Sequence, residues 1–471
     1  MRPFLFYLFV LTGLFNTAVA QTARPNIVLI IADDLGWKDV GFMGSTFYET
    51  PNLDRLAREG LHFTSAYTAA ANCAPSRACL LSGQYSPRHG IYTVANADRG
   101  EAKTRKLIPV KNNEMLPDSV YTLAEALRDA GYQTASIGKW HLGKTPSSQG
   151  FTYSVAGDER GMNKHFSPYG IPTLPDGPPG EYLTDRLTTE ALAFIEKAKD
   201  KPNRPGEPAA QPFFLYLPYY AVHTPLQAPA ELVKKYQNKA KSAGQQDATY
   251  AAMIESLDSN VGRILQKLDA LHLTDNTIVI FTSDNGGIRS ISRQDPLRAG
   301  KGSYYEGGVR VPLVVRWPGT VAAGTVSATP VINLDFYPTF LAILNEPKPR
   351  QPLDGVSFLP LLKGKTVPER PLYWHFPIYL EAYNPQRDGG RDPLFRTRPG
   401  STIRLGDWKL HEYFEDNGLE LYNLKTDLGE QHNVASENGA VVKKLHSLLK
   451  KWRAQNAAFI PNEVNPSYSA H

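Results

Sequence analysis

The sequence predicts an α/β protein in which helices sandwich a large, mostly parallel sheet, followed by a smaller antiparallel sheet with a closing helix. Apolar runs rich in β-branched and aromatic residues, such as 26–32 and 277–282, alternate with segments of helical periodicity, such as 249–271. The runs are apolar throughout, as is typical of parallel strands that are buried on both faces. After about residue 365, short strands separated by turns such as Asp416-Asn417-Gly418 replace this alternation.

The expected elements follow this pattern in order. The first region has expected strands at 26–32, 134–137, 213–220, 277–282 and 313–316, and expected helices from Thr50-Pro51 to Gly60, after Cys73, and at 122–129, 184–199 and 249–271. Residues 145–182 are predicted to form a long surface loop over the strand ends, and 202–211 a linker. The last region has expected strands at 371–376, 401–405, 408–413 and 419–423 and a helix at 440–453. We therefore divide the chain into a leader at 1–20, a catalytic α/β domain at 21–365 and a C-terminal α+β subdomain at 366–471, which is expected to contribute to a substrate cleft.

The first twenty residues resemble a secretory signal peptide. Arg2 provides the positive start, 4–15 is apolar, and Ala18-Val19-Ala20 is a small-residue cleavage site. The apolar core is shorter than the roughly 20 residues of a membrane span, and no later stretch is long and apolar enough. We expect a periplasmic or secreted protein cleaved near Ala20 with no stable membrane span; an uncleaved anchor is the alternative.

The charge and the cysteine content limit the possible partners of the protein and the state of its cysteines. The chain has 51 Lys and Arg against 46 Asp and Glu, a formal charge of +5, which gives no reason to expect a nucleic acid partner. Its two cysteines, Cys73 and Cys79, are six positions apart. On one helix this places their Cα atoms about 9 Å apart, farther than a disulfide spans. Cys73 is thus free for chemistry, and Cys79 is most simply a small buried hydrophobe.

The stretch 72–83 predicts an anion site at the start of a helix. Pro75 suits the first helical turn, so Cys73 lies just before the helix and faces its unpaired N–H groups. Arg77, one turn later, adds a planar cation suited to sulfate or phosphate. The pattern predicts a reactive cysteine; a helix that merely begins with Cys is the alternative.

Polar residues follow four of the predicted strands. In open α/β sheets ligands bind at the carboxyl ends of the strands, so these residues are expected to converge. Three carboxylates and an amide oxygen suit a hard cation such as Ca²⁺ or Mg²⁺. With the cation, Arg77, Lys139 and Lys301 the site carries about two positive charges, which favours an anionic substrate such as a sulfate monoester. The residues after the strands are Asp33 and Asp34, Lys139 and His141, His223, and Asp284 and Asn285.

These motifs together resemble one family. Cys73-Ala74-Pro75-Ser76-Arg77 with Leu81-Ser82-Gly83, followed by 137–143, 282–286 and Lys301-Gly302, is similar to the signature of type I, formylglycine-dependent sulfatases in the alkaline-phosphatase-like superfamily, including secreted bacterial polysaccharide sulfatases. The resemblance extends from Arg24 to Ala435. Ser82, where Thr is commoner, and Gln84, where a basic residue is commoner, are the departures.

The resemblance implies a modified nucleophile and a metal. A separate maturation enzyme would oxidise Cys73 to formylglycine (3-oxoalanine), whose hydrate attacks sulfur. One Ca²⁺, in preference to Mg²⁺, would be bound by Asp33, Asp34, Asp284, Asn285 and modified residue 73.

The resemblance also implies roles for the remaining groups. Arg77 would hold the hydrate, and Lys139 and Lys301 would bind sulfate oxygens. Asp284 would accept the first proton, His223 with Lys301 would protonate the departing alcohol, and His141 would deprotonate the second hydrate hydroxyl to expel sulfate.

The expected function is therefore an exported sulfatase acting on sulfated carbohydrate, of algal or other polysaccharide origin. Two alternatives remain at this stage: a phosphonate or phosphodiester hydrolase of the same superfamily, and a non-catalytic glycan-binding relative.

The candidates for binding the sugar are aromatic, histidine and arginine residues in 374–398, specifically Trp374, His375 and Arg398. His165 is a further candidate, and an ordinary solvated loop is the alternative for this segment.

Overall fold

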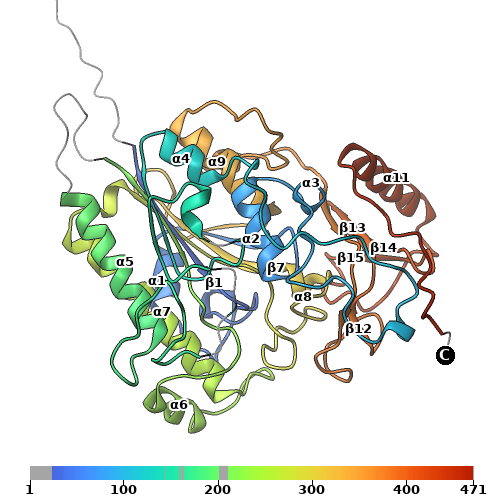
Figure 1. Ribbon diagram of the computed structural model, residues 1–471, viewed down its shortest axis with the longest axis horizontal. Helices are drawn as coiled ribbons and strands as arrows, with labels where there is room; N and C mark the ends of the chain where they lie inside the picture. Colours follow the sequence, from blue (N-terminus) through green and yellow to red (C-terminus); the bar gives the residue numbers. More distant parts are fainter. Residues whose placement is uncertain (1–23, 144, 159–160, 162–163, 201–210, 470–471) are drawn as a thin grey trace, which may run out of the picture.

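The computed structural model describes residues 24–143, 145–158, 161, 164–200 and 211–469. It contains a nine-stranded sheet surrounded by helices, with a four-stranded sheet beside it (Figure 1). The predicted leader at 1–20 and almost all of the predicted linker at 202–211 lie outside the described residues. Within the described residues, no helix has both the length and the apolar character to cross a membrane.

The nine-stranded sheet is parallel except for one strand. Its order is β4-β3-β5-β1-β6-β7-β2-β8, and β9 pairs with β2. Strand β7 runs antiparallel to both of its neighbours, while the other pairs are parallel. The strands are β1 (Asn26–Ala32), β2 (Leu61–Tyr67), β3 (Gln133–Ile137), β4 (Tyr153–Val155), β5 (Phe213–Pro218), β6 (Thr277–Ser283), β7 (Arg310–Arg316), β8 (Thr325–Ser327) and β9 (Val331–Ile332).

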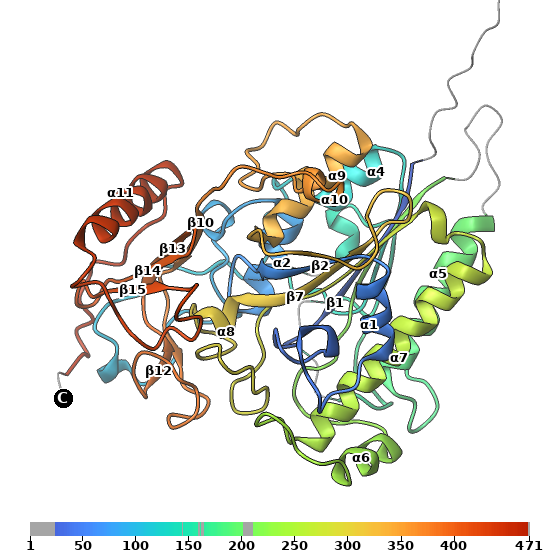
Figure 2. The same ribbon diagram turned by 180° about the vertical axis from the view of Figure 1, so that it is seen from behind.

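Both faces of this sheet are buried, which explains its apolar strands. In β1, alternate side chains enter two different hydrophobic clusters, Val28 and Ile30 in one and Ile27 and Leu29 in the other. Helices α1, α5 and α7 contribute to the first cluster, and α2, α4 and α9 to the second (Figure 2). The helices are α1 (Pro51–Arg58), α2 (Cys73–Ser82), α3 (Ser86–His89), α4 (Leu123–Asp129), α5 (Leu183–Asp200), α6 (Ala230–Gln237), α7 (Ala248–Ala270), α8 (Glu306–Val309), α9 (Phe336–Leu344), α10 (Leu359–Leu362) and α11 (Gly439–Gln455).

The predicted α/β class is confirmed, and two of its details change. The segment 145–182, predicted to be a loop, contains the edge strand β4, which pairs with β3. Strand β2 was not predicted, because His62, Thr64 and Ser65 interrupt the apolar side chains of 61–67. It lies between β7 and the short strands β8 and β9.

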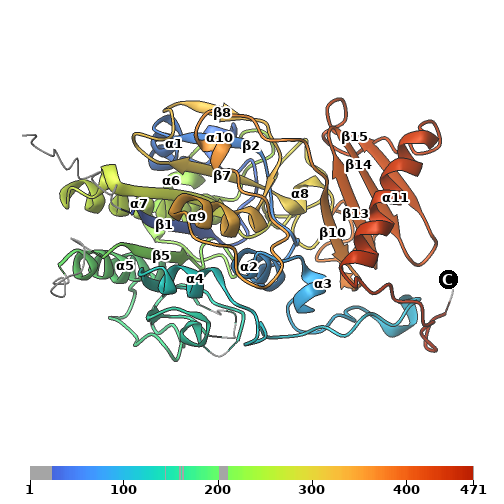
Figure 3. The same ribbon diagram turned by 90° about the horizontal axis from the view of Figure 1, so that it is seen from above.

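The C-terminal region forms the predicted small antiparallel sheet with its closing helix. Helix α11 packs on this sheet (Figure 3), where Leu445, Leu449 and Trp452 join the cluster formed by its strands. A separate two-stranded ladder, β11 with β12, projects from the same region. The strands are β10 (Leu372–Phe376), β11 (Leu380–Glu381), β12 (Phe395–Thr397), β13 (Gly400–Leu405), β14 (Trp408–Tyr413) and β15 (Leu419–Asn423).

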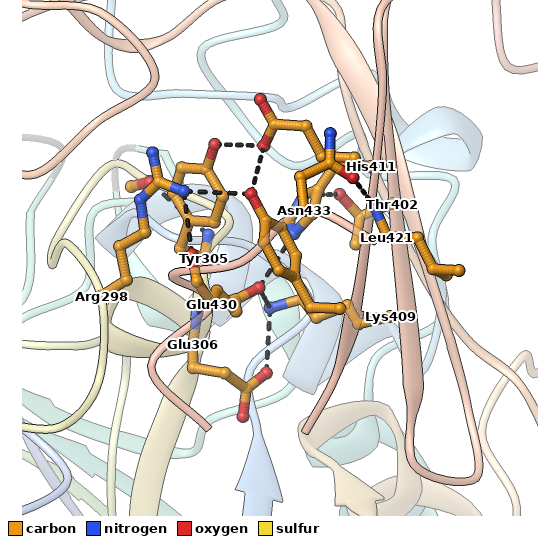
Figure 4. A network of polar contacts seen from close by, with 12 residues as sticks. Arg298, Tyr305, Glu306, Thr402, Lys409, His411, Leu421, Glu430 and Asn433 are labelled. Carbon is orange, nitrogen blue, oxygen red and sulfur yellow. Dashed lines mark hydrogen bonds and ion pairs between the residues drawn. The ribbon is translucent and has the colours of Figure 1, made fainter. Parts of the chain in front are cut away.

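A buried polar network joins the two sheets (Figure 4). Glu306, at the start of α8, pairs with Lys409 of β14 at 2.9 Å, and Lys409 also pairs with Glu430 at 3.1 Å. Glu430 accepts hydrogen bonds from His411 at 3.0 Å and from the backbone N–H of Glu306 at 2.5 Å. All four side chains are fully buried. The network thus fixes the small sheet against the segment that begins with Lys301.

The charge of Glu306 contributes to stability in a pH-dependent way. Burial alone would raise its pKa, but Lys409, Arg310 and Arg404 outweigh burial and lower the pKa from 4.5 to about 2. Because the folded-state pKa is the lower one, this stabilisation is complete above the unfolded-state pKa and is lost as the pH falls toward the folded-state value. A shift of this size corresponds to about 3 kcal/mol.

Glu306→Gln should therefore lower the melting temperature strongly at about pH 7 and much less at about pH 3. Thermal unfolding at the two pH values measures the difference. Glu101→Gln is the matched control, because Glu101 pairs with Lys103 at the surface, where its side chain is 71% exposed. An equal loss for Glu306→Gln at both pH values would contradict the assigned charge.

Candidate functional site

Helix α2 presents Cys73 at its first turn. It begins at Cys73, directly after the extended residue Asn72, so Cys73 is the first helical residue and not the residue before the helix. The helix ends at Ser82, because Gly83 adopts a left-handed conformation (φ 66°) and donates its N–H to the carbonyl of Cys79. Every residue of α2 is buried. Both cysteines are free, as predicted.

The strand ends bring the predicted polar residues to one place beside Cys73. Its Sγ lies 3.5 Å from Asp33 Oδ1 and 3.9 Å from Asp34 Oδ1, both just after β1. Asp34 takes a left-handed conformation (φ 63°), which Asp tolerates better than most residues, and its N–H donates to Asp284, just after β6. The parallel pairing of β1 with β6 puts these two ends side by side.

Three buried cations face the three carboxylates. Arg77 donates to Asp284 Oδ2 from Nε at 3.0 Å and from Nη2 at 2.6 Å. Lys139 Nζ lies 2.6 Å from Asp33 Oδ2. Lys301 Nζ lies 2.7 Å from Asp34 Oδ2. The charges are therefore paired one to one across the site.

The donor set fits a hard divalent cation. Ligand atoms of Asp33, Asp34, Cys73 and His223 lie within 4.8 Å of one another. Asn285 donates its Nδ2 to Asp34 Oδ1 at 2.8 Å, while no described residue donates a hydrogen bond to its buried Oδ1. A buried carbonyl oxygen without a partner is costly unless a cation or water satisfies it. Carboxylate and amide oxygens are the ligands that Ca²⁺ and Mg²⁺ prefer.

Burial raises the pKa values of the Cys73 thiol and of the Asp284 carboxyl group. Burial raises the pKa of Cys73 to about 12, although Lys139 and Lys301 act in the opposite direction. Burial thus disfavours the thiolate of the unmodified side chain, and a reactive residue 73 stays a prediction. Burial and the neighbouring Asp33 raise the pKa of Asp284 to about 6.

Both histidines of the site are neutral at neutral pH. Burial and Lys139 hold the pKa of His141 well below its usual value, and its buried Nδ1 has no hydrogen-bond partner among the residues that the structure describes. Burial and Lys301 lower the pKa of His223 to about 4. Its Nδ1 donates to the carbonyl of Thr224 at 2.5 Å, which leaves Nε2 as an acceptor. The site thus contains two imidazoles able to accept a proton.

Trp374 and His375 do not face a substrate, so that prediction is wrong. Trp374 is fully buried between the two sheets, and its Nε1 donates to the carbonyl of Thr68 at 2.7 Å. His375 is also buried, and its ring nitrogens are occupied by Ser401 and the carbonyl of Phe459. Both residues belong to β10, the edge strand of the small sheet, which pairs with β13.

Arg398 and His165 have other partners as well. Arg398 pairs with Asp392 at 2.5 Å and Glu415 at 2.8 Å, beside a cavity of 520 Å³ that contains none of the catalytic candidates. His165 is fully buried, and its Nε2 donates to the backbone carbonyl of His223 at 2.9 Å. It therefore holds the backbone of His223 and presents no exposed surface to a sugar.

Asp39 is a residue of this region that the sequence did not reveal. It accepts hydrogen bonds from the N–H of Gly36 at 2.9 Å, from Tyr250 at 2.7 Å and from Ser292. These contacts tie the loop after β1 to the loop that follows Asn285. Nothing in the local pattern distinguishes Asp39 from an ordinary loop aspartate.

Comparison with known proteins agrees with this geometry. A family model described as sulfatase matches residues 25–346, and one described as N-sulphoglucosamine sulphohydrolase, C-terminal, matches 300–455. A sulfatase of Formosa agariphila is 35% identical over 92% of this chain and 90% of its own length. The N-acetylgalactosamine-6-sulfatase of Canis lupus familiaris is 33% identical, with coverage of 89% and 77%.

A solved structure extends the likeness to the fold. The crystal structure of Ps i-CgsB in complex with k-i-k-neocarrahexaose is 32% identical to this chain, with a TM-score of 0.74. The match covers 93% of this chain and 95% of that one. By sequence and by fold, the chain belongs to the sulfatase family of the alkaline-phosphatase-like superfamily and is a sulfuric ester hydrolase.

Proposed function

We propose that this sulfatase hydrolyses sulfate monoesters on carbohydrate, in a sulfated polysaccharide such as an algal one or in its oligosaccharides. The observation that carries the proposal is the row of buried cations, Arg77, Lys139 and Lys301, beside residue 73. Relatives named for N-acetylgalactosamine 6-sulfate and a structure with bound neocarrahexaose support a carbohydrate substrate.

The proposal includes formylglycine at position 73 and one Ca²⁺ held by Asp33, Asp34, Asp284 and Asn285 with residue 73. The unpartnered Oδ1 of Asn285 supports the cation. When present, the aldehyde hydrate supplies an attacking oxygen that a thiol lacks, and the cation supplies positive charge that polarises the sulfate group. The protonated thiol of Cys73 supports the view that the cysteine is a precursor.

The buried cations bind the substrate and orient the nucleophile. Lys139 and Lys301 have ammonium groups 2.6 and 2.7 Å from the carboxylates beside residue 73. In the complex they donate to sulfate oxygens and stabilise the charge that develops there. Arg77, fixed by hydrogen bonds to Asp284 and to a backbone carbonyl, orients residue 73.

Four groups move protons. Asp284, with its pKa near neutrality, accepts the proton of the attacking hydroxyl. His223 acts together with Lys301 on the departing alcohol oxygen: the Lys301 ammonium supplies the proton, and the acceptor Nε2 of His223 passes it to that oxygen. His141 accepts the last proton through its unpartnered Nδ1 as sulfate is released.

The same proposal covers export and maturation. The leader at 1–20 supports a periplasmic or secreted location. A formylglycine-generating enzyme is the required protein partner. Its action on residue 73 precedes any turnover.

A panel of substrates tests the proposed function. Desalted mature protein should release sulfate from sulfated mono- and oligosaccharides and from an aryl sulfate, with kcat/KM at least about 100-fold above that for an aryl phosphodiester or phosphonate; such a ratio is about 2.7 kcal/mol of transition-state discrimination. A higher value for the phosphodiester would favour the phosphodiesterase alternative. Glycan binding without turnover, in protein shown to contain formylglycine, would favour the non-catalytic alternative.

A further inference from the structure

One exposed aromatic side chain lies beside the segment that carries Lys301. Tyr383 is 50% exposed, and its other face stacks on the guanidinium of Arg396, whose central carbon lies 3.3 Å from the ring centre. Both residues belong to the β11–β12 region. We call this stacked pair the Tyr383–Arg396 platform.

Arg396 connects the platform directly to Lys301. Its Nη1 donates to the backbone carbonyl of Lys301 at 3.1 Å, and its Nε donates to the carbonyl of Glu381 at 2.8 Å. The hydroxyl of the next residue, Thr397, donates to the carbonyl of Gly302. The phenol of Tyr383 is also among the groups, after Asp34, that oppose burial and raise the pKa of Lys301. The ring therefore lies at the rim of the site.

The backbone of Tyr383 is fixed as well. The buried carboxylate of Asp388 accepts hydrogen bonds from the N–H of Tyr383 at 2.6 Å and of Asn384 at 3.0 Å. The Arg396 guanidinium covers one face of the Tyr383 ring, and Asp388 fixes its backbone. The side chain therefore loses little conformational entropy when a ligand covers its free face. Such a rigid, amphipathic surface is suited to stacking against the apolar face of a sugar ring.

The charge under the ring sets Arg396 apart from Arg391 and Arg398 of the same loop, and its burial sets it apart from the exposed Arg387. Arg398 is neutralised by two carboxylates, and Arg391 by Asp416 and Glu420. Among the described residues, Arg396 is bonded only to backbone carbonyls and the ring, with no carboxylate in ion-pair distance. A buried cation without a counter-ion is costly unless a ligand brings negative charge. The platform thus favours an anionic partner.

We infer that Tyr383 stacks on the sugar ring next to the one that carries the scissile sulfate, and that the charge of Arg396 selects for an anionic saccharide chain. This inference rests on the proposed function, because it needs sulfate to bind at Lys301. It replaces the expectation for Trp374 and His375, whose rings are buried. It also predicts that the kcat/KM of this enzyme depends on the length of the saccharide chain.

The test compares long and short substrates in Tyr383 variants. The probes are neocarrahexaose and a hexasaccharide containing N-acetylgalactosamine 6-sulfate, against 4-nitrophenyl sulfate. Tyr383→Ala should reduce kcat/KM on the hexasaccharide that is turned over by about tenfold more than on the aryl sulfate, mainly through KM, which corresponds to about 1.4 kcal/mol of lost binding. Tyr383→Phe should restore most of this loss, because the ring remains.

Two control variants separate stacking from positioning. Arg396→Lys keeps the charge under the ring but changes the group that holds the backbone of Lys301, so it should reduce kcat/KM on the aryl sulfate as well, which Tyr383→Ala should not. Tyr468→Ala removes an exposed aromatic residue of the C-terminal tail and should change neither. Similar losses for Tyr383→Ala on both kinds of substrate would overturn the inference, and so would no loss on either.

Binding to Cys73→Ala protein makes the test independent of turnover. Each hexasaccharide is titrated calorimetrically into Cys73→Ala and into Cys73→Ala with Tyr383→Ala. A roughly tenfold weaker Kd in the double variant supports the platform even where turnover is absent. Failure of wild-type protein to release sulfate from any carbohydrate would refute the proposed function. Equal affinities, or no binding of either hexasaccharide, would refute the platform.

Discussion

Replacing Cys73 with Ala should reduce sulfate release by at least about 10⁴-fold, the scale seen when a catalytic nucleophile is removed. The reason is chemical: neither a methyl group nor the surrounding carboxylates can supply the attacking oxygen. In the wild-type protein the peptide that contains residue 73 should react with a hydrazide reagent and not with a thiol reagent. Mass spectrometry of that peptide measures both reactions.

Cys79→Ala is the matched control, since Cys79 lies on the same helix and is equally buried. Its Sγ contacts Ser86 and His89, both 3.5 Å away and outside the catalytic group. This variant should keep turnover within a few-fold of wild type and lose about 1 kcal/mol of stability, as small core truncations do. Full turnover by protein in which residue 73 is still a thiol would contradict the proposed nucleophile.

The convergence of the site could be predicted from strand pattern alone. Asp33, His223 and Asp284 each follow a run that is apolar on both faces, and parallel strands end at the same edge of their sheet. The structure has β5, β1 and β6 as parallel neighbours in that order. The pairing therefore follows from the same pattern that identified the strands.

The direction of strand β7 and the burial of single side chains could not be predicted from the strand pattern. Strand β7 is buried along its whole length, like the parallel strands β1, β5 and β6, but its connections make it run in the opposite direction. Trp374 and Tyr383 are both aromatic residues close to arginines in one segment. Only packing between the two sheets makes one a buried core residue and leaves the other half exposed. The pKa of Cys73 has the same origin, because burial outweighs the nearby cations.

Arg77→Met should have the largest effect on stability among the site variants. Arg77 is fully buried and lies 2.6 Å from Asp284 and 3.8 Å from Asp33. Its removal leaves the buried carboxylate of Asp284 without its cation, while Asp33 keeps Lys139. Breaking a buried ion pair in this way costs about 3–5 kcal/mol. Activity should fall by about 10²–10³-fold as well, because a preorganised charge beside the nucleophile is lost. Denaturant unfolding and sulfate release measure the two effects.

The size of the stability loss should depend on Ca²⁺ if these carboxylates hold a cation. Bound Ca²⁺ offsets the repulsion that Arg77 otherwise relieves, so Arg77→Met should lose less stability in excess Ca²⁺ than in a chelator. Arg88→Met, which breaks a partly exposed pair with Asp354, should cost about 1 kcal/mol or less in both conditions. Equal losses for Arg77→Met with and without Ca²⁺ would mean that the cation binds elsewhere. A Ca²⁺-dependent loss confined to Arg77→Met would place the cation among Asp33, Asp34 and Asp284, because Arg77 pairs with Asp284 and lies 3.8 Å from Asp33.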